Sequence, residues 1–210
     1  MNRRSKIRAL VGVVGLAFGM YGSGALATIV GSIHDFNGDA WNGKAEICVV
    51  CHTPHNAGLA TDGPLWDRAA STATYTPYSS PLGTLDVVVG TPGGASKLCL
   101  SCHDGTVAME SFGGNTVTTT TLIGGINPLK DFGTDLSDDH PISFQYSAST
   151  DTALEPEANV VTAGLLVGGT GGNVECASCH DVHNNGAAGA GFLLRVSNTA
   201  SGLCLTCHTK

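Results

Sequence analysis

The sequence predicts a coil-rich fold with short helices and a few short strands, held together by something other than a large apolar core. Three observations lead to this prediction. Of the 210 residues, 29 are glycine and only 6% are aromatic, so the chain has little material for an ordinary core. Long stretches that contain glycine, threonine and serine separate the apolar residues. All eight cysteines occur in pairs with one spacing, which suggests that they attach the stabilising groups.

The first 27 residues are expected to be a signal peptide that is removed during export. Four basic residues within positions 3–8 precede a short apolar run at 10–21, and residues 25–27 (ALA) form a typical cleavage site. The alternative is an uncleaved anchor helix, but the apolar run is short for a membrane span. We therefore expect export through the secretory pathway, to the cell surface or extracellular space or, alternatively, to the periplasm.

The expected mature chain is acidic. It contains all 17 acidic residues but only six of the ten basic ones, which gives a net charge of −11 with neutral histidines. Nucleic acid is therefore not an expected partner, because its phosphates are neutralised by lysine and arginine. No later stretch is apolar enough to cross a membrane.

The cysteines form four identical motifs, in which two cysteines separated by two residues are followed at once by a histidine. C-x-x-C-H is the attachment motif of c-type haem. Each thiol bonds one vinyl group of the same porphyrin, and the histidine binds the iron from the proximal side. The motifs predict four covalent haem c groups. Their residues are Cys48, Cys51 and His52; Cys99, Cys102 and His103; Cys176, Cys179 and His180; and Cys204, Cys207 and His208.

Two other interpretations of the cysteines are weaker. Disulfides suit an oxidising compartment, but they do not explain why a histidine follows every second cysteine. Structural zinc uses cysteine and histidine ligands, but zinc sites do not require this repeated pentapeptide.

The remaining histidines match the number of haems. Four haems with two axial ligands each need eight histidines, and the chain has eight. Iron with two histidine ligands has no vacant position for a substrate, so it suits electron transfer rather than catalysis. Met109 is the alternative sixth ligand, but we favour a packing role because choosing it would leave one histidine over. The candidate distal ligands are His34, His55, His140 and His183.

The spacing of the histidines restricts how they pair. His52 and His55 are three residues apart, so in a helical turn both project from one face and cannot bind one iron from opposite sides. The third motif repeats this spacing with His180 and His183. We expect these two segments to exchange ligands, with His55 serving the third haem and His183 the first.

The last two histidines are assigned by elimination. Pro141 favours an extended conformation at His140, which suits a side chain that projects from a loop, and we expect His140 to serve the second haem. His34 then remains for the fourth haem, which His208 holds. Iron ligation would also anchor the N-terminal arm.

An internal repeat organises the chain. The segments CHTPHNAG (51–58), LWDR (65–68) and LCLSCH (98–103) are matched by CHDVHNNG (179–186), LLRV (193–196) and LCLTCH (203–208). We expect a single tetrahaem domain over 28–210. It comprises an N-terminal arm (28–40), a first haem pair (48–103), a haem-free insert (104–175) and a second haem pair (176–208). Within the insert, residues 116–121 favour a strand and residues 165–172 a turn.

These segments resemble a known family. The paired CxxCHxxH and CxxCH units, with GSIHDF at 31–36, ICVVCHTPHNAG at 47–58, DDHPISF at 138–144 and the final CLTCH, are similar to OmcE-type tetrahaem cytochromes of metal-reducing bacteria. The resemblance implies subunits that polymerise into extracellular conducting filaments. It also implies that His34 is donated to a haem of the neighbouring subunit. Expected partners are further copies of the chain, upstream periplasmic or outer-membrane cytochromes, and extracellular electron acceptors.

Three functions compete at this point. The first is a subunit of an electron-carrying filament, and the second is a monomeric periplasmic tetrahaem shuttle with the same ligands. A multihaem reductase ranks below both, because it needs an open iron position and all four motifs here are regular.

Overall fold

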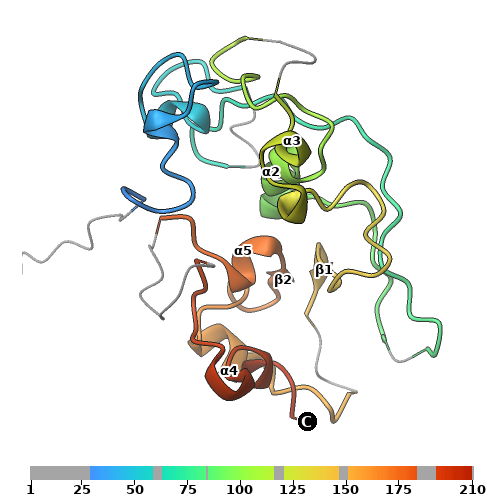
Figure 1. Cartoon of the computed structure of the whole chain (residues 1–210). Helices are drawn as coiled ribbons and strands as arrows, with labels where there is room; N and C mark the ends of the chain where they lie inside the picture. Colours follow the sequence, from blue (N-terminus) through green and yellow to red (C-terminus); the bar gives the residue numbers. More distant parts are fainter. Residues whose placement is uncertain are drawn as a thin grey trace, which may run out of the picture.

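The structure is a computed structural model that describes residues 29–58, 63–83, 85–115, 121–146, 151–183 and 193–209 (Figure 1). The expected signal peptide, 1–27, lies outside the described residues. So does most of the run at 116–121 for which the sequence predicts a strand.

Short helical segments joined by coil make up the described chain, as the sequence predicts. The strands β1 (Phe144–Gln145) and β2 (Asn173–Val174) pair antiparallel, with Phe144 opposite Val174. The α-helices are α2 (Gly94–His103), α3 (Ile123–Ile126), α4 (Glu157–Thr162) and α5 (Cys176–Cys179). The 3₁₀ turns are η1 (Phe36–Gly38), η2 (Cys48–Val50), η3 (Pro128–Lys130), η4 (Thr199–Ser201) and η5 (Cys204–Thr206).

Every cysteine motif begins or completes one of these helical segments. The motifs lie on η2, the end of α2, α5 and η5. In three of them the backbone N–H of the proximal histidine donates to the carbonyl of the first cysteine, at 2.8 Å for His52, 3.0 Å for His180 and 2.9 Å for His208. One helical turn brings residues three and four apart to the same side. Both cysteines and the histidine of a motif can therefore reach one group.

The internal repeat of the sequence is also a repeat of the backbone. In each unit the proximal histidine forms an isolated antiparallel bridge with the residue after a leucine. Leu65 and Leu193, the two leucines, both adopt the left-handed conformation, with φ of 57° and 55°. The matching hydrogen bonds are Thr53 N to Leu65 O and Asp67 N to Cys51 O in the first unit, and Asp181 N to Leu193 O and Arg195 N to Cys179 O in the second.

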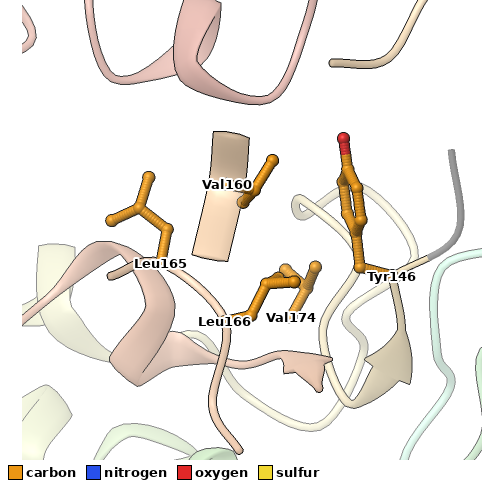
Figure 2. Packing of buried hydrophobic residues seen from close by; sticks show 5 residues of the cluster. All are labelled: Tyr146, Val160, Leu165, Leu166 and Val174. Atoms are coloured by element: carbon orange, nitrogen blue, oxygen red, sulfur yellow. The ribbon is translucent and has the colours of Figure 1, made fainter. Parts of the chain in front are cut away.

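A small apolar cluster packs between β1, β2 and α4, and Figure 2 shows its five buried side chains. Tyr146 joins this cluster to the fourth motif, because its hydroxyl donates to the carbonyls of Glu155 at 2.6 Å and Cys207 at 3.3 Å. The region between the second and third motifs is therefore a packed part of the fold. The five residues are Tyr146, Val160, Leu165, Leu166 and Val174.

Candidate haem-binding site

None of the eight cysteines forms a disulfide. Contacts between cysteines of successive motifs place these motifs next to one another. The Cys51 thiol of the first motif interacts with Cys102 of the second. Cys99 of the second motif shares a hydrogen bond with Cys176 of the third. The third and fourth motifs meet where Cys179 interacts with Cys204 and Cys207. Each motif is therefore a neighbour of the next one along the chain.

Burial makes several of these thiols poor nucleophiles and poor metal ligands. It raises the pKa of Cys51 to about 12 and that of Cys207 to about 11, and it also raises the pKa of Cys102. Redox and metal-binding cysteines need the opposite, a lowered pKa that favours the thiolate. A thioether carries no charge, so these buried positions suit covalent attachment of a porphyrin.

Three histidines of the motifs each lie opposite one histidine from elsewhere in the chain. The ring centres of His52 and His183 are 6.1 Å apart, and those of His34 and His103 are 6.2 Å apart. The third pair, His140 and His208, is separated by 6.5 Å. Each pair contains one proximal histidine and one of the four candidate distal ligands.

The spacing of these pairs fits an iron ion bound between them. Two imidazoles on opposite sides of one metal ion have ring centres roughly 6 Å apart, from about 2 Å per metal–nitrogen bond and about 1 Å within each ring. Among the described residues, histidine, cysteine, aspartate and glutamate form no group of three or more that could hold a metal ion. A zinc site needs three or four protein ligands, whereas a porphyrin supplies four nitrogens itself and needs only two. The residues present therefore fit haem.

Backbone carbonyls fix the orientation of three of these rings. Nδ1 of His52 donates to the carbonyl of Pro64 at 2.8 Å, and Nδ1 of His103 donates to that of Lys130 at 2.8 Å. His140 makes the same contact with the carbonyl of Pro141, at 2.9 Å. A carbonyl only accepts, so the proton lies on Nδ1 and Nε2 keeps its lone pair for a metal.

The His34 ring is held neutral inside the fold. Burial, reinforced by the nearby His103 and His180 rings, lowers the pKa of His34 to about 4. Burial also lowers the pKa of His103, the ring opposite. Nδ1 of His34 is buried without a hydrogen-bond partner. A neutral imidazole is the form that binds iron, so both members of this pair are prepared for ligation.

The structure places the histidines only partly as the pairing expected from the sequence would require. It brings His183 to His52, as the ligand exchange predicts. His140 and His34, however, occupy each other's expected positions: His140 faces His208 of the fourth motif, and His34 faces His103 of the second.

The tertiary fold explains this difference. The segment that carries His140 continues into β1, which pairs with β2, and Tyr146 at its end donates to the carbonyl of Cys207. His140 is therefore carried to the fourth motif. The N-terminal arm folds on itself through Asn42, whose side chain donates to the carbonyls of Phe36 and Glu46 at 3.0 Å. This turn presents His34 to the second motif.

The remaining predicted ligands are His55 and His180, and both lie on the segments that the His52–His183 pair brings together. Met109 is 1% exposed, and its carbonyl accepts a hydrogen bond from Arg68 at 2.7 Å. It is therefore a core residue, in agreement with the packing role favoured from the sequence.

Sequence reasoning missed the aromatic residues beside the proximal histidines. The Trp66 ring meets His52 edge-on with ring centres 5.8 Å apart, and Phe132 stacks on His103 at 5.4 Å. Nε1 of Trp66 is buried without a hydrogen-bond partner. The position of Trp66 directly after Leu65 in the repeated segment was the available signal, whereas nothing in the sequence marks Phe132.

Within the described part of the chain, no helix is long and apolar enough to span a membrane. A comparison with protein families matches residues 170–210 to the doubled CXXCH motif, and this range contains the third and fourth motifs. No curated protein matches the chain. Multihaem c-type cytochromes are typically exported proteins. The matched motif, together with the two further C-x-x-C-H motifs and the facing histidines, supports the assignment of this chain to the multihaem c-type cytochromes.

Proposed function

We propose that this protein is an electron carrier with four covalently attached haem c groups, each held by two histidines. The observation that carries the proposal is the set of three histidine pairs with ring centres 6.1, 6.2 and 6.5 Å apart. Each pair joins the proximal histidine of one motif to a histidine from a distant segment.

The fourth ligand pair follows from the internal repeat. His183, three residues after His180, lies opposite His52. The repeat relates His55 to His183 and His52 to His180. We therefore pair His55 with His180, which completes the exchange between the first and third motifs and uses all eight histidines.

The chain's own residues favour electron transfer over catalysis. Haem supplies an iron that changes its oxidation state by one electron. Histidines on both sides of the iron leave no position for a substrate, and carbonyls fix several of the rings. The cysteine contacts between successive motifs hold the four attachment sites next to one another. This arrangement suits the passage of electrons between neighbouring groups.

We further propose that the mature protein assembles into an extracellular filament. The support is the resemblance of the arm and the DDHPISF segment to filament-forming cytochromes. The arm leaves two apolar side chains accessible, with Val30 66% and Ile33 58% exposed. Exchange of this arm between copies would let His34 meet His103 of a neighbour, and such head-to-tail contacts generate open fibres.

The alternative is a monomeric periplasmic carrier, and one observation favours it. His34 faces His103 of its own chain, so a single copy can supply every ligand. Gel filtration and electron microscopy of the haem-loaded protein distinguish the two states, because arm exchange predicts long uniform filaments and the monomer predicts small particles.

The central proposal is tested by intact mass spectrometry and electron paramagnetic resonance of the oxidised protein. We expect a mass increase of four haems and only low-spin iron. A smaller mass increase would contradict the number of haems. A high-spin signal would show an open iron position and would support a reductase.

A further inference from the structure

Arg68 is a buried cation between the first and second motifs. It is 2% exposed, and its guanidinium donates to the carbonyls of Met109 and Ala108 at 2.7 Å and of Ser101 at 3.4 Å. Ser101 directly precedes Cys102 of the second motif. The residue before Arg68 donates its backbone N–H to the carbonyl of Cys51, at 2.9 Å. Hydrogen bonds therefore place the arginine between the two attachment sites.

The charge of Arg68 has no ionic partner in the described part of the chain. The oxygens that it contacts belong to neutral carbonyls, and the cysteine beside it, Cys102, is a thiol. A buried charge surrounded by neutral groups is screened less than a surface charge. Its field therefore reaches both attachment sites, because hydrogen bonds hold Arg68 beside Ser101, which precedes Cys102, and next to the residue hydrogen-bonded to Cys51.

The repeat shows that the position of Arg68 can be occupied by an apolar side chain. Arg68 of LWDR corresponds to Val196 of LLRV, which packs against the apolar cluster. Both units have the same left-handed leucine and the same bridge to the proximal histidine. The architecture of a haem pair therefore accepts an apolar side chain at this position, and a buried charge distinguishes the first unit from the second, whose turn carries the more exposed Arg195.

Glu175 is the complementary feature, a buried carboxylate between the second and third motifs. It is 3% exposed and directly precedes Cys176. Its carboxylate accepts hydrogen bonds from the hydroxyl of Ser96 at 2.5 Å and from that of Ser143 at 2.9 Å. Ser96 lies on α2, one turn before Cys99, and its hydroxyl accepts the backbone N–H of Cys176 at 2.9 Å. Hydrogen bonds from neutral donors stabilise a negative charge at this junction.

We infer that Arg68 and Glu175 set a step in reduction potential along the chain of haems, with the first haem above the third. A buried cation favours the reduced iron, which carries one positive charge less, and a buried anion favours the oxidised iron. Among the buried charged residues that the structure describes, Arg68 is the one next to the first site and Glu175 the one next to the third, whereas Asp67, Asp181 and Arg195 at these sites are only partly buried or exposed. The second site lies between Arg68 and Glu175 and is also close to Asp104, a buried carboxylate that receives hydrogen bonds from Tyr75 and Thr106. Opposing charges therefore largely offset one another there.

This inference rests on the proposed function, and its test uses the haem-loaded protein. Reduction potentials of the individual haems are followed by nuclear magnetic resonance during stepwise reduction. We expect R68M to lower the potential of the first haem and E175Q to raise that of the third. R68K keeps the charge while it loses the hydrogen-bonding fork, so the first potential should remain near the wild-type value.

R195Q is the matched control, since Arg195 is the cation of the corresponding turn in the second unit. Its side chain is 35% exposed and lies 3.4 Å from Asp181, so its charge is screened and compensated. We expect R195Q to shift the reduction potential of the third haem less than R68M shifts that of the first. An unshifted first haem in R68M, or equal shifts in R68K and R68M, would overturn the role of the Arg68 charge. If R68M fails to fold, E175Q still tests the effect of the Glu175 charge on the potential of the third haem. A wild-type protein without four low-spin haems would overturn the proposed function itself.

Discussion

At the residue scale, a single hydrogen bond decides which nitrogen of a histidine is available to iron. The rings of His52 and His103 donate Nδ1–H to the carbonyls of Pro64 and Lys130. Each ring therefore presents Nε2, with a fixed orientation, to the histidine opposite. Such contacts also make a ring a stronger ligand. Because the acceptors are backbone carbonyls, the orientation depends on the folded loops rather than on any particular side chain.

Replacing His34 tests the ligand assignment of the second haem. H34M should leave four haems attached, because the thioether bonds do not depend on the distal ligand. The ligation of one haem should change, and spectra of H103M should show the change at the same haem. Intact mass and electron paramagnetic resonance measure the two effects. Loss of all haems, or an unchanged spectrum, would contradict this assignment. H183M is the matched control, because it should change the first haem instead.

At the scale of elements, short segments are held by side chains rather than by long ladders of backbone hydrogen bonds. Two strands of two residues each cannot fix a fold alone. Tyr146, at the end of β1, supplies the additional contacts to Glu155 and Cys207 and packs in the apolar cluster. This residue therefore connects β1 to the fourth motif, and with it places His140.

Y146F should lower the free energy of unfolding by about 1–2 kcal/mol, because the partly buried carbonyl of Glu155 loses this donor and that of Cys207 keeps only the backbone N–H of Glu155. Burial raises the pKa of Tyr146 to about 12, from about 10 in the unfolded chain. Its contribution is therefore complete below pH 10 and decreases as the pH rises from 10 towards 12. Denaturant unfolding at several pH values measures both effects. If the wild type and Y146F lose stability equally across this range, the role of the hydroxyl is wrong.

Substitutions at two glycines after the second motif distinguish the cost of backbone strain from the cost of close packing. Gly105 and Gly113 have similar left-handed conformations, with φ of 68° and 62°. A Cβ at Gly105 would lie 2.5 Å from the Asp131 carboxylate oxygens, whereas one at Gly113 would meet no atom within 4 Å.

G113A should therefore cost only the strain of a left-handed alanine, about 1–2 kcal/mol. G105A should cost more, because Asp131 must also move. Thermal unfolding of the haem-loaded variants compares them. Equal losses of stability would show that Asp131 moves away without cost.

At the scale of the whole molecule, the polypeptide provides little apolar core of its own around the four motifs. Fourteen hydrophobic residues are buried in the described part of the chain, and five of them form the cluster around Tyr146. Apolar burial on this scale cannot balance the conformational entropy of a coil-rich chain. Covalently attached porphyrins would add both apolar contacts and cross-links.

Prevention of haem attachment should therefore abolish cooperative unfolding. A chain with all eight cysteines replaced by serine should be cleaved rapidly by protease, and its circular dichroism should change gradually on heating. The haem-loaded wild type is the control. A cysteine-free chain that unfolds in one sharp transition would contradict a haem-stapled fold.

The sequence predicted the helical turn at each motif and the repeat, which depend on local pattern, and the equal spacing of histidines in the first and third motifs predicted the approach of His183 to His52. It could not assign His34 and His140, because their positions depend on the pairing of β1 with β2 and on the folded arm. Nor did it predict that Arg68 is buried, because an arginine in a short polar segment ordinarily remains exposed. Long-range contacts decided each of these cases.

The pairing of histidines across each iron is the central claim, and an experimental structure of the haem-loaded protein tests it most directly. We predict that His34 and His103 flank one iron, His140 and His208 a second, and His52 and His183 a third, whether the arm folds within one chain or exchanges between copies. A density map that places His34 on the haem of His208, or His140 on that of His103, would contradict it.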